Sequence, residues 1–271
     1  MAAGPRVLGA PAYAIHRIGG STPGDFVSFD TDDPGGGVLI GNVGFGNVGT
    51  MDFFAGDLWA VSGDNNVLSF YTIDTATAQA TFRSSFGGPF GGTSVFSGSF
   101  DNNGYYWVTD FSTDVIRKLD PLTGASLFSA PIAPSAGPNG IAFVGDTLYA
   151  VHGGFGDPLQ EFGTLNTQTG VFDLIGLTGV GVGGMGGGNG TGALDYDPVT
   201  DTMYLVYRAG IQPGQLWSLY TVDLATGGAT FVGEIQPERN YDAFAVLPEP
   251  ASLTLLLGAL LGGGRRSRAR R

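Results

Sequence analysis

The chain has 271 residues, of which 48 are glycine and none is cysteine, and its formal net charge is −12. The absence of cysteine excludes disulfide frameworks, thiolate catalysis and cysteine-ligated metal centres. Residues 1–247 carry seven Arg or Lys and 23 Asp or Glu, a net charge of −16. Such a body repels nucleic-acid phosphates and anionic lipid surfaces, so we expect no nucleic-acid partner.

The first residues end in a pattern typical of signal-peptide cleavage. Ala10, Ala12 and Ala14 follow the A-x-A spacing, but no basic region and apolar core precede them. We expect residues 1–12 to be the remnant of a signal peptide whose true start lies upstream. In-frame upstream codons that encode no basic and apolar stretch would contradict this expectation.

A repeat with a period of roughly 45 residues organises the following body, residues 13–247. One line of the repeat reads aromatic, small or aliphatic, aliphatic, polar. Its five copies are Tyr13-Ala14-Ile15-His16, Trp59-Ala60-Val61-Ser62, Trp107-Val108-Thr109-Asp110, Tyr149-Ala150-Val151-His152 and Tyr204-Leu205-Val206-Tyr207. The recurring aromatic residue suits packing between repeats.

Each copy continues into a second strand that ends in Asp or Asn. These strands are 26–30, 70–74, 116–120, 162–166 and 219–223. Turns such as Pro121-Leu122-Thr123-Gly124 follow, in which the Asp or Asn side chain accepts backbone N–H groups and glycine supplies positive φ. Further apolar segments precede and follow each pair, which makes four short strands per repeat. That content is typical of propeller blades.

The two ends of the body complement each other. Residues 241–246 resemble the leading strand at 139–144, and the first copy lacks a convincing leading strand of its own. We therefore expect an all-β, five-bladed β-propeller closed by its N- and C-terminal strands. An open β-solenoid or a sandwich is the alternative, and neither would require the last strand to resemble interior strands.

The polar position that ends each aromatic line is a candidate ligand site. It holds His16, Ser62, Asp110, His152 and Tyr207, one from each copy. Two imidazoles and a carboxylate are suited to a divalent metal. Polar residues at strand ends explain the same pattern without a ligand, so the sequence leaves the metal unknown.

Acidic residues in the leading strands form a second candidate. Asp52 and Asp242 occupy matching places in the predicted leading strands of neighbouring blades, with Asp195 one residue out of register. Paired carboxylates near a propeller axis are compatible with glycoside hydrolysis. Hydrogen-bonded or solvated acids are the simpler interpretation.

Oxygen-rich turns offer calcium as the one possible cofactor. They are Asp30-Thr31-Asp32-Asp33, Gly63-Asp64-Asn65-Asn66, Asp101-Asn102-Asn103-Gly104 and Asp195-Tyr196-Asp197. Carboxylate and amide oxygens suit calcium, although none of these turns follows the EF-hand spacing. Hairpin turns are the simpler explanation.

The last segment, 248–271, combines three elements. A Pro248-Glu249-Pro250 hinge interrupts regular structure, an uncharged stretch follows at 251–264, and five arginines end the chain: Arg265, Arg266, Arg268, Arg270 and Arg271. As a helix the apolar stretch would span about 21 Å, short of the hydrocarbon core of about 30 Å. The arginines would remain on the cytoplasmic side.

This arrangement resembles the PEP-CTERM sorting signal of exported bacterial proteins, with Pro248, Glu249 and Pro250 as the matching motif. The resemblance covers 247–271 and implies an exosortase-like partner, transient residence in the inner membrane through a short C-terminal helix, and final placement at the cell surface or outside the cell. An ordinary C-terminal anchor explains the apolar stretch and the arginines, but not the hinge.

Two functions follow from these expectations. The first is an exported, non-catalytic propeller that presents a binding surface to exopolysaccharide or surface proteins. The second is an exported glycan-active hydrolase that uses axial carboxylates such as Asp52 and Asp242. We favour the first, because the resemblance to the sorting signal supports a surface protein, and the sequence shows neither a substrate cleft nor an acid with a raised pKa.

Overall fold

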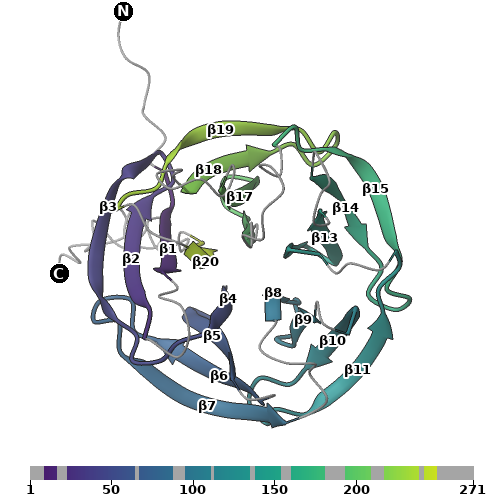
Figure 1. Ribbon diagram of the computed structural model, residues 1–271, viewed down its shortest axis with the longest axis horizontal. Coiled ribbons are helices and arrows are strands. Elements are labelled where there is room, and N and C mark those ends of the chain that lie inside the picture. Colours follow the sequence, from purple (N-terminus) through teal and green to yellow (C-terminus); the bar gives the residue numbers. More distant parts are fainter. Residues whose placement is uncertain are drawn as a thin grey trace, which may run out of the picture.

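A computed structural model of the chain describes residues 9–16, 23–64, 67–87, 95–110, 113–134, 138–153, 160–180, 193–208, 217–237 and 241–248. Within these residues the protein is an all-β, five-bladed propeller, as the repeat predicts. Five antiparallel sheets of four strands each stand around a central axis (Figure 1). Blade 1 has the order β20-β1-β2-β3, and blades 2 to 5 are β4–β7, β8–β11, β12–β15 and β16–β19.

The strands fall into four concentric sets. The innermost strands are β20 (Tyr241–Val246), β4 (Val48–Phe54), β8 (Val95–Phe100), β12 (Gly140–Val144) and β16 (Ala193–Asp197). The second strands, which hold the aromatic line of the repeat, are β1 (Pro11–His16), β5 (Asp57–Asp64), β9 (Tyr106–Asp110), β13 (Thr147–His152) and β17 (Thr202–Arg208).

The two outer sets match the remaining predicted segments. The third strands are β2 (Asp25–Asp30), β6 (Val67–Ile73), β10 (Val115–Leu119), β14 (Glu161–Leu165) and β18 (Trp217–Val222). The outermost strands are β3 (Asp33–Asn42), β7 (Ala80–Gly87), β11 (Ser126–Pro131), β15 (Phe172–Leu177) and β19 (Ala229–Glu234). The outermost strands form the outer rim of the ring (Figure 1).

The core lies between the blades. Five hydrophobic clusters each join one blade to the next, so no blade buries its apolar face alone. Between blades 2 and 3, for example, the ring of Trp59 meets Phe100 edge-on at 5.7 Å, and Phe70 meets Tyr106 at 5.7 Å. The repeated aromatic residues thus pack between blades, as expected for the repeat.

Strand β20 lies beside β1 in blade 1. Tyr13 pairs with Ala245, and His16 pairs with Tyr241 after a register shift. The first blade therefore contains strands from both ends of the described chain. The predicted C-terminal helix lies outside the described residues, and within them no helix is long and apolar enough to span a membrane.

The predicted turns between the third and outermost strands have the expected mechanism. Asn166 Oδ1 accepts the N–H groups of Gln168 at 2.9 Å and Thr169 at 3.0 Å, and Gly170 has a φ of +72°. A Cβ at Gly170 would overlap the carbonyl oxygen of Pro131 in the preceding blade. Glycine is therefore required here for its backbone conformation and for contact between blades.

We expect Gly170→Ala to destabilise the propeller more than Gly145→Ala. Both glycines have positive φ, which costs an alanine about 1 to 2 kcal/mol, but a Cβ at Gly145 meets no atom within 4 Å. The contact with Pro131 adds about 1 to 3 kcal/mol at Gly170. Urea unfolding of both variants measures the difference, and equal losses of stability would contradict the role assigned to this contact.

Candidate functional site

The predicted site residues lie at two opposite ends of the blades. His16, Asp110 and His152 end their second strands, at the face where those strands lead to the third strands. Asp52 pairs with Trp59 on the second strand of its blade. The position of that strand equivalent to His16, Asp110 and His152 is Ser62, three residues further on, so Asp52 lies about 10 Å along the blade from that end. The structure therefore does not bring the predicted residues into one site.

The residues at the first end have local partners. His152 packs against Phe172 with ring centroids 5.5 Å apart, and its Nδ1 lies 3.5 Å from the carboxylate of Glu161. Asp110 accepts the hydroxyl of Thr113 at 2.6 Å. These residues lie on the second strand of each blade rather than on the innermost one. Among the described residues no group of three His, Asp or Glu is arranged to hold a metal ion.

The strand register corrects the predicted match between Asp52 and Asp242. The innermost residues that face the repeated aromatic residues are Ala245, Asp52, Ser99, Ala142 and Asp195. Asp195 is thus the counterpart of Asp52, whereas Asp242 lies three residues before Ala245. The predicted match compares places within the leading strands, and these do not reveal the register of a strand with its neighbour.

Asp52 and Asp195 satisfy backbone groups around the axis. Asp52 Oδ2 accepts the N–H of Phe100 in the next blade at 2.7 Å and the hydroxyl of Ser99 at 2.9 Å. Asp195 Oδ2 accepts the N–H of Val246 in the next blade at 2.6 Å. Each aspartate therefore joins two neighbouring innermost strands.

The same two carboxylates serve the N–H groups that follow them, and Ser99 serves a third blade. Asp195 Oδ1 accepts the N–H of Tyr196 at 2.8 Å, and Asp52 also accepts the N–H of Phe53. The hydroxyl of Ser99 accepts the N–H of Phe143 at 3.3 Å. In each blade, the N–H in question belongs to the residue after the one that faces the repeated aromatic residue. Three side chains thus provide acceptors for this N–H in all five blades.

Burial makes both carboxyl groups weaker acids than ordinary aspartates. It raises the pKa of Asp52 from 3.8 to about 6, and the hydrogen bonds from Phe100, Ser99 and Phe53 only partly offset this effect. Burial and the nearby charge of Asp52 raise the pKa of Asp195 well above 3.8, despite its bonds to Val246 and Tyr196. The second proton is harder to remove than the first, because two like charges would then share the axis.

These acids line an axial cavity of about 250 Å³. It opens where the innermost strands end and turn into the second strands, a side that we call the hairpin face. Ser99, Phe143 and Pro248 also line the cavity, so the described chain ends beside it. A raised-pKa carboxyl in a cavity has the protonation behaviour of a general acid, but its oxygens here already bind backbone groups.

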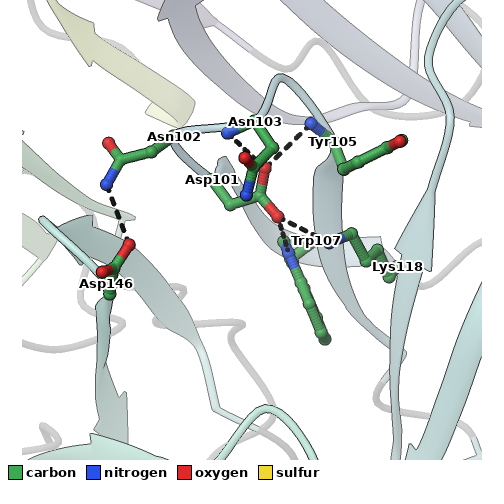
Figure 2. A network of polar contacts seen from close by, with 7 residues as sticks. All are labelled: Asp101, Asn102, Asn103, Tyr105, Trp107, Lys118 and Asp146. Atoms are coloured by element: carbon green, nitrogen blue, oxygen red, sulfur yellow. Dashed lines mark hydrogen bonds and ion pairs between the residues drawn. The ribbon is translucent and has the colours of Figure 1, made fainter.

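One of the predicted calcium turns forms a different network (Figure 2). Asp101 Oδ1 accepts the N–H groups of Asn103 at 2.9 Å and Tyr105 at 3.0 Å, while Oδ2 accepts the indole N–H of Trp107 at 3.0 Å and lies 2.8 Å from Lys118 Nζ. The side chain therefore holds its own loop and an ion pair. In another such turn, Asp30 accepts the N–H of Asp32 at 2.8 Å.

The sequence interpretation missed Ser99 and Lys118 as members of these sites, and it placed Asp195 one residue out of register with Asp52. Lys118 carried a signal, because it is the only lysine of the chain and occupies a strand position that other blades fill with Ser or Thr. Ser99 carried none, since isolated serines are common in strands. Asp195 required the pairing of β16 with β17 to be known.

Neither a protein-family profile nor a curated protein sequence matches this chain. Among solved structures, one chain of a nidogen/laminin complex is similar at 11% identity and a TM-score of 0.53, covering 87% of this chain and 98% of that one. Myxococcus xanthus glutaminyl cyclase has 11% identity and a TM-score of 0.46, covering 78% and 95%. Virginiamycin B lyase from Staphylococcus aureus has 12% identity and a TM-score of 0.44, covering 83% and 71%. At these identities the likeness is one of fold.

We expect the free energy of unfolding to fall as the pH rises from about 4 to about 6. Asp52 has an ordinary pKa of 3.8 when unfolded and about 6 when folded, so the folded protein binds more protons in this window. The slope for one proton reaches about 1.4 kcal/mol per pH unit. Asp52→Asn cannot ionise and should flatten the slope in urea unfolding between pH 4 and 7.

Asp74→Asn is the matched control. Hydrogen bonds from Ala76 and Thr77 lower the pKa of Asp74, so its contribution to stability is lost as the pH falls through a value below 3.8, outside the window. A slope that persists unchanged in Asp52→Asn would show that other groups cause it.

Proposed function

We propose that this chain is an exported, non-catalytic binding propeller of the cell surface or extracellular matrix. Its partners are polysaccharide or surface proteins, and its C-terminal segment is the sorting signal. The observation that carries the non-catalytic part of this proposal is the hydrogen bonding of the two axial acids. Asp52 and Asp195 accept backbone N–H groups of the innermost strands, so the propeller itself accounts for their presence.

The position of the tail supports the sorting part of the proposal. Pro248 begins the predicted hinge and lies at the axial cavity, so the described chain ends on the hairpin face. A C-terminal segment that starts at the surface is accessible to a membrane-bound processing enzyme. Glu249, Pro250 and the arginines lie outside the described residues, and their role rests on the resemblance to PEP-CTERM signals.

A hydrolase remains the second candidate because of one specific observation. Asp52 and Asp195 line the same cavity, and burial raises the pKa of both carboxyl groups. Glycosidases use pairs of carboxyl groups of which one is protonated near neutral pH. The difference is that a hydrolase must present these oxygens to a substrate, whereas here they bind the protein backbone.

We expect the mature protein from its native cells to end near Pro248–Ala251 and to occur outside the inner membrane. Intact mass measured on membrane, surface and medium fractions tests this. Replacement of Pro248, Glu249 and Pro250 by alanine should leave an uncut chain in the membrane. A wild-type chain that stays uncut in the membrane would indicate an ordinary anchor and contradict sorting.

The two candidate functions differ in their response to Asp52→Asn and Asp195→Asn. We expect the wild-type chain to release no reducing ends from soluble polysaccharides, and both variants to change stability rather than turnover. Release of reducing ends by the wild type, lost in a variant that keeps its fold by circular dichroism, would support the hydrolase instead.

A further inference from the structure

A second cavity, of about 500 Å³, opens between blades 3 and 4 on the hairpin face. We call it the inter-blade pocket. Blade 3 contributes Asp101, Asn103, Trp107, Lys118 and Phe128. Blade 4 contributes Phe143, Asp146, Thr167 and Gln168. Its volume lies within the range typical of ligand sites, roughly 300 to 1,000 Å³.

The pocket is built where blade 3 departs from the repeat. The residues that face the repeated aromatic residue on the third strand are Ser28, Thr72, Lys118, Thr164 and Thr221. Four blades show that a small hydroxyl side chain satisfies the fold at this position. Lys118 is therefore not needed to build a blade.

The loop between β8 and β9 is also longer than its counterparts in blades 2 and 4. Phe100 pairs with Tyr106, which leaves five residues in the loop, whereas Val144 pairs with Thr147 across two. Asp101 fixes this loop through four contacts, to Asn103, Tyr105, Trp107 and Lys118 (Figure 2). The pocket wall is thus held in place by a side chain whose acceptor capacity is fully used.

Asp101 stays ionised in this network. Burial would raise its pKa, but the bonds from Lys118, Trp107 and the backbone of Tyr105 and Asn103 together lower it. The ion pair holds Lys118 Nζ 4.3 Å from the ring centroid of Tyr105 and 5.2 Å from that of Trp107. An ammonium group has three N–H donors, so donors remain for a ligand.

Aromatic rings form the apolar part of the pocket. Trp107 lies 6.1 Å from Phe128 and 6.3 Å from Phe143, centroid to centroid, and both phenyl rings are tilted by more than 50° relative to the indole. Tilted rings around a buried indole form a concave apolar surface. Such a surface can pack against the C–H face of a ring-shaped ligand.

Polar groups surround this surface and favour a neutral ligand rich in hydroxyl groups. Asn103, Thr167 and Gln168 offer both donors and acceptors, and Asp146, held by Asn102 at 3.1 Å, adds a carboxylate (Figure 2). A purely apolar ligand would leave these groups without partners. The two carboxylates of the pocket and the negative charge of the body repel an acidic ligand.

The inter-blade pocket continues toward the axis. Asp101 and Phe143 line both this pocket and the axial cavity, and the hydrogen bond from Asn102 to Asp146 joins the two blades near both. A ligand that extends beyond one ring can therefore follow the hairpin face from between the blades to the centre. This geometry suits a chain of linked units better than a single small molecule.

We propose that the inter-blade pocket binds one pyranose unit of a neutral polysaccharide, with Trp107, Phe128 and Phe143 against the sugar face and Lys118, Asp146 and Gln168 bonded to its hydroxyl groups. This proposal deepens the binding function proposed above and rests on it. It assigns the ligand class and the face that the earlier proposal leaves open.

Isothermal titration of the full chain with five hexasaccharides tests the proposal. The neutral probes are cellohexaose, laminarihexaose and mannohexaose, the cationic probe is chitosan hexamer, and the acidic probe is galacturonic acid hexamer. We expect at least one neutral probe to bind, and neither charged probe to bind more tightly than it.

The decisive variant is Lys118→Thr, which introduces the residue that three other blades have at this position and should fold normally. Loss of a charged donor should weaken neutral binding about tenfold or more. Phe128→Ala should weaken it about three- to tenfold. Phe82→Ala is the matched control, because Phe82 is an exposed aromatic residue of an outermost strand, β7, and lies outside the pocket lining.

Three results would overturn the proposal: no neutral probe binds, a charged probe binds more tightly than any neutral one, or neutral binding is unchanged in Lys118→Thr and Phe128→Ala. Failure here differs from failure of the proposed function, which is judged by the mature C-terminus and its location. A surface protein with the expected C-terminus but no neutral glycan binding would have lost only this ligand assignment.

Discussion

Hydrogen bonding at the axis is the constraint on which the rest of the propeller depends. Each innermost strand has one edge without a partner strand, and its buried N–H groups need acceptors. Asp52, Ser99 and Asp195 supply them for five blades, because each aspartate serves both the N–H that follows it and one in the next blade. Alanines therefore suffice at the two remaining positions, 142 and 245.

The use of two aspartates as acceptors at the axis has an electrostatic cost. Two carboxyl groups buried around one axis resist simultaneous ionisation, so their protonation is linked to the packing of the innermost strands. The same observation explains why the axis resembles a hydrolase site in composition. Raised pKa values arise at catalytic centres and also at structural polar networks, and the partners of the oxygens distinguish the two.

The sequence was sufficient for the number of blades, because aromatic lines and Asx turns recur with a regular period. It was insufficient for the register of the innermost strands. The pairing of β20 with β1 places Ala245, three residues after Asp242, opposite Tyr13, and a shared apolar pattern does not specify which residues lie opposite each other. Contacts between blades, such as Asp52 with Phe100, depend on packing that no local pattern encodes.

A repeat protein contains its own comparison, since every blade must meet the same packing requirements. Where the turn glycine is replaced by Ala78, with a φ of +62°, the facing residue of blade 1 is Gly41, so that departure is compensated within the fold. Lys118 is a departure of another kind. Its charge is neutralised by Asp101, which in turn belongs to an extended loop, and none of these features improves the packing of a blade. Departures that create a polar, aromatic-walled cavity instead of restoring packing are where the function of such a scaffold should be sought.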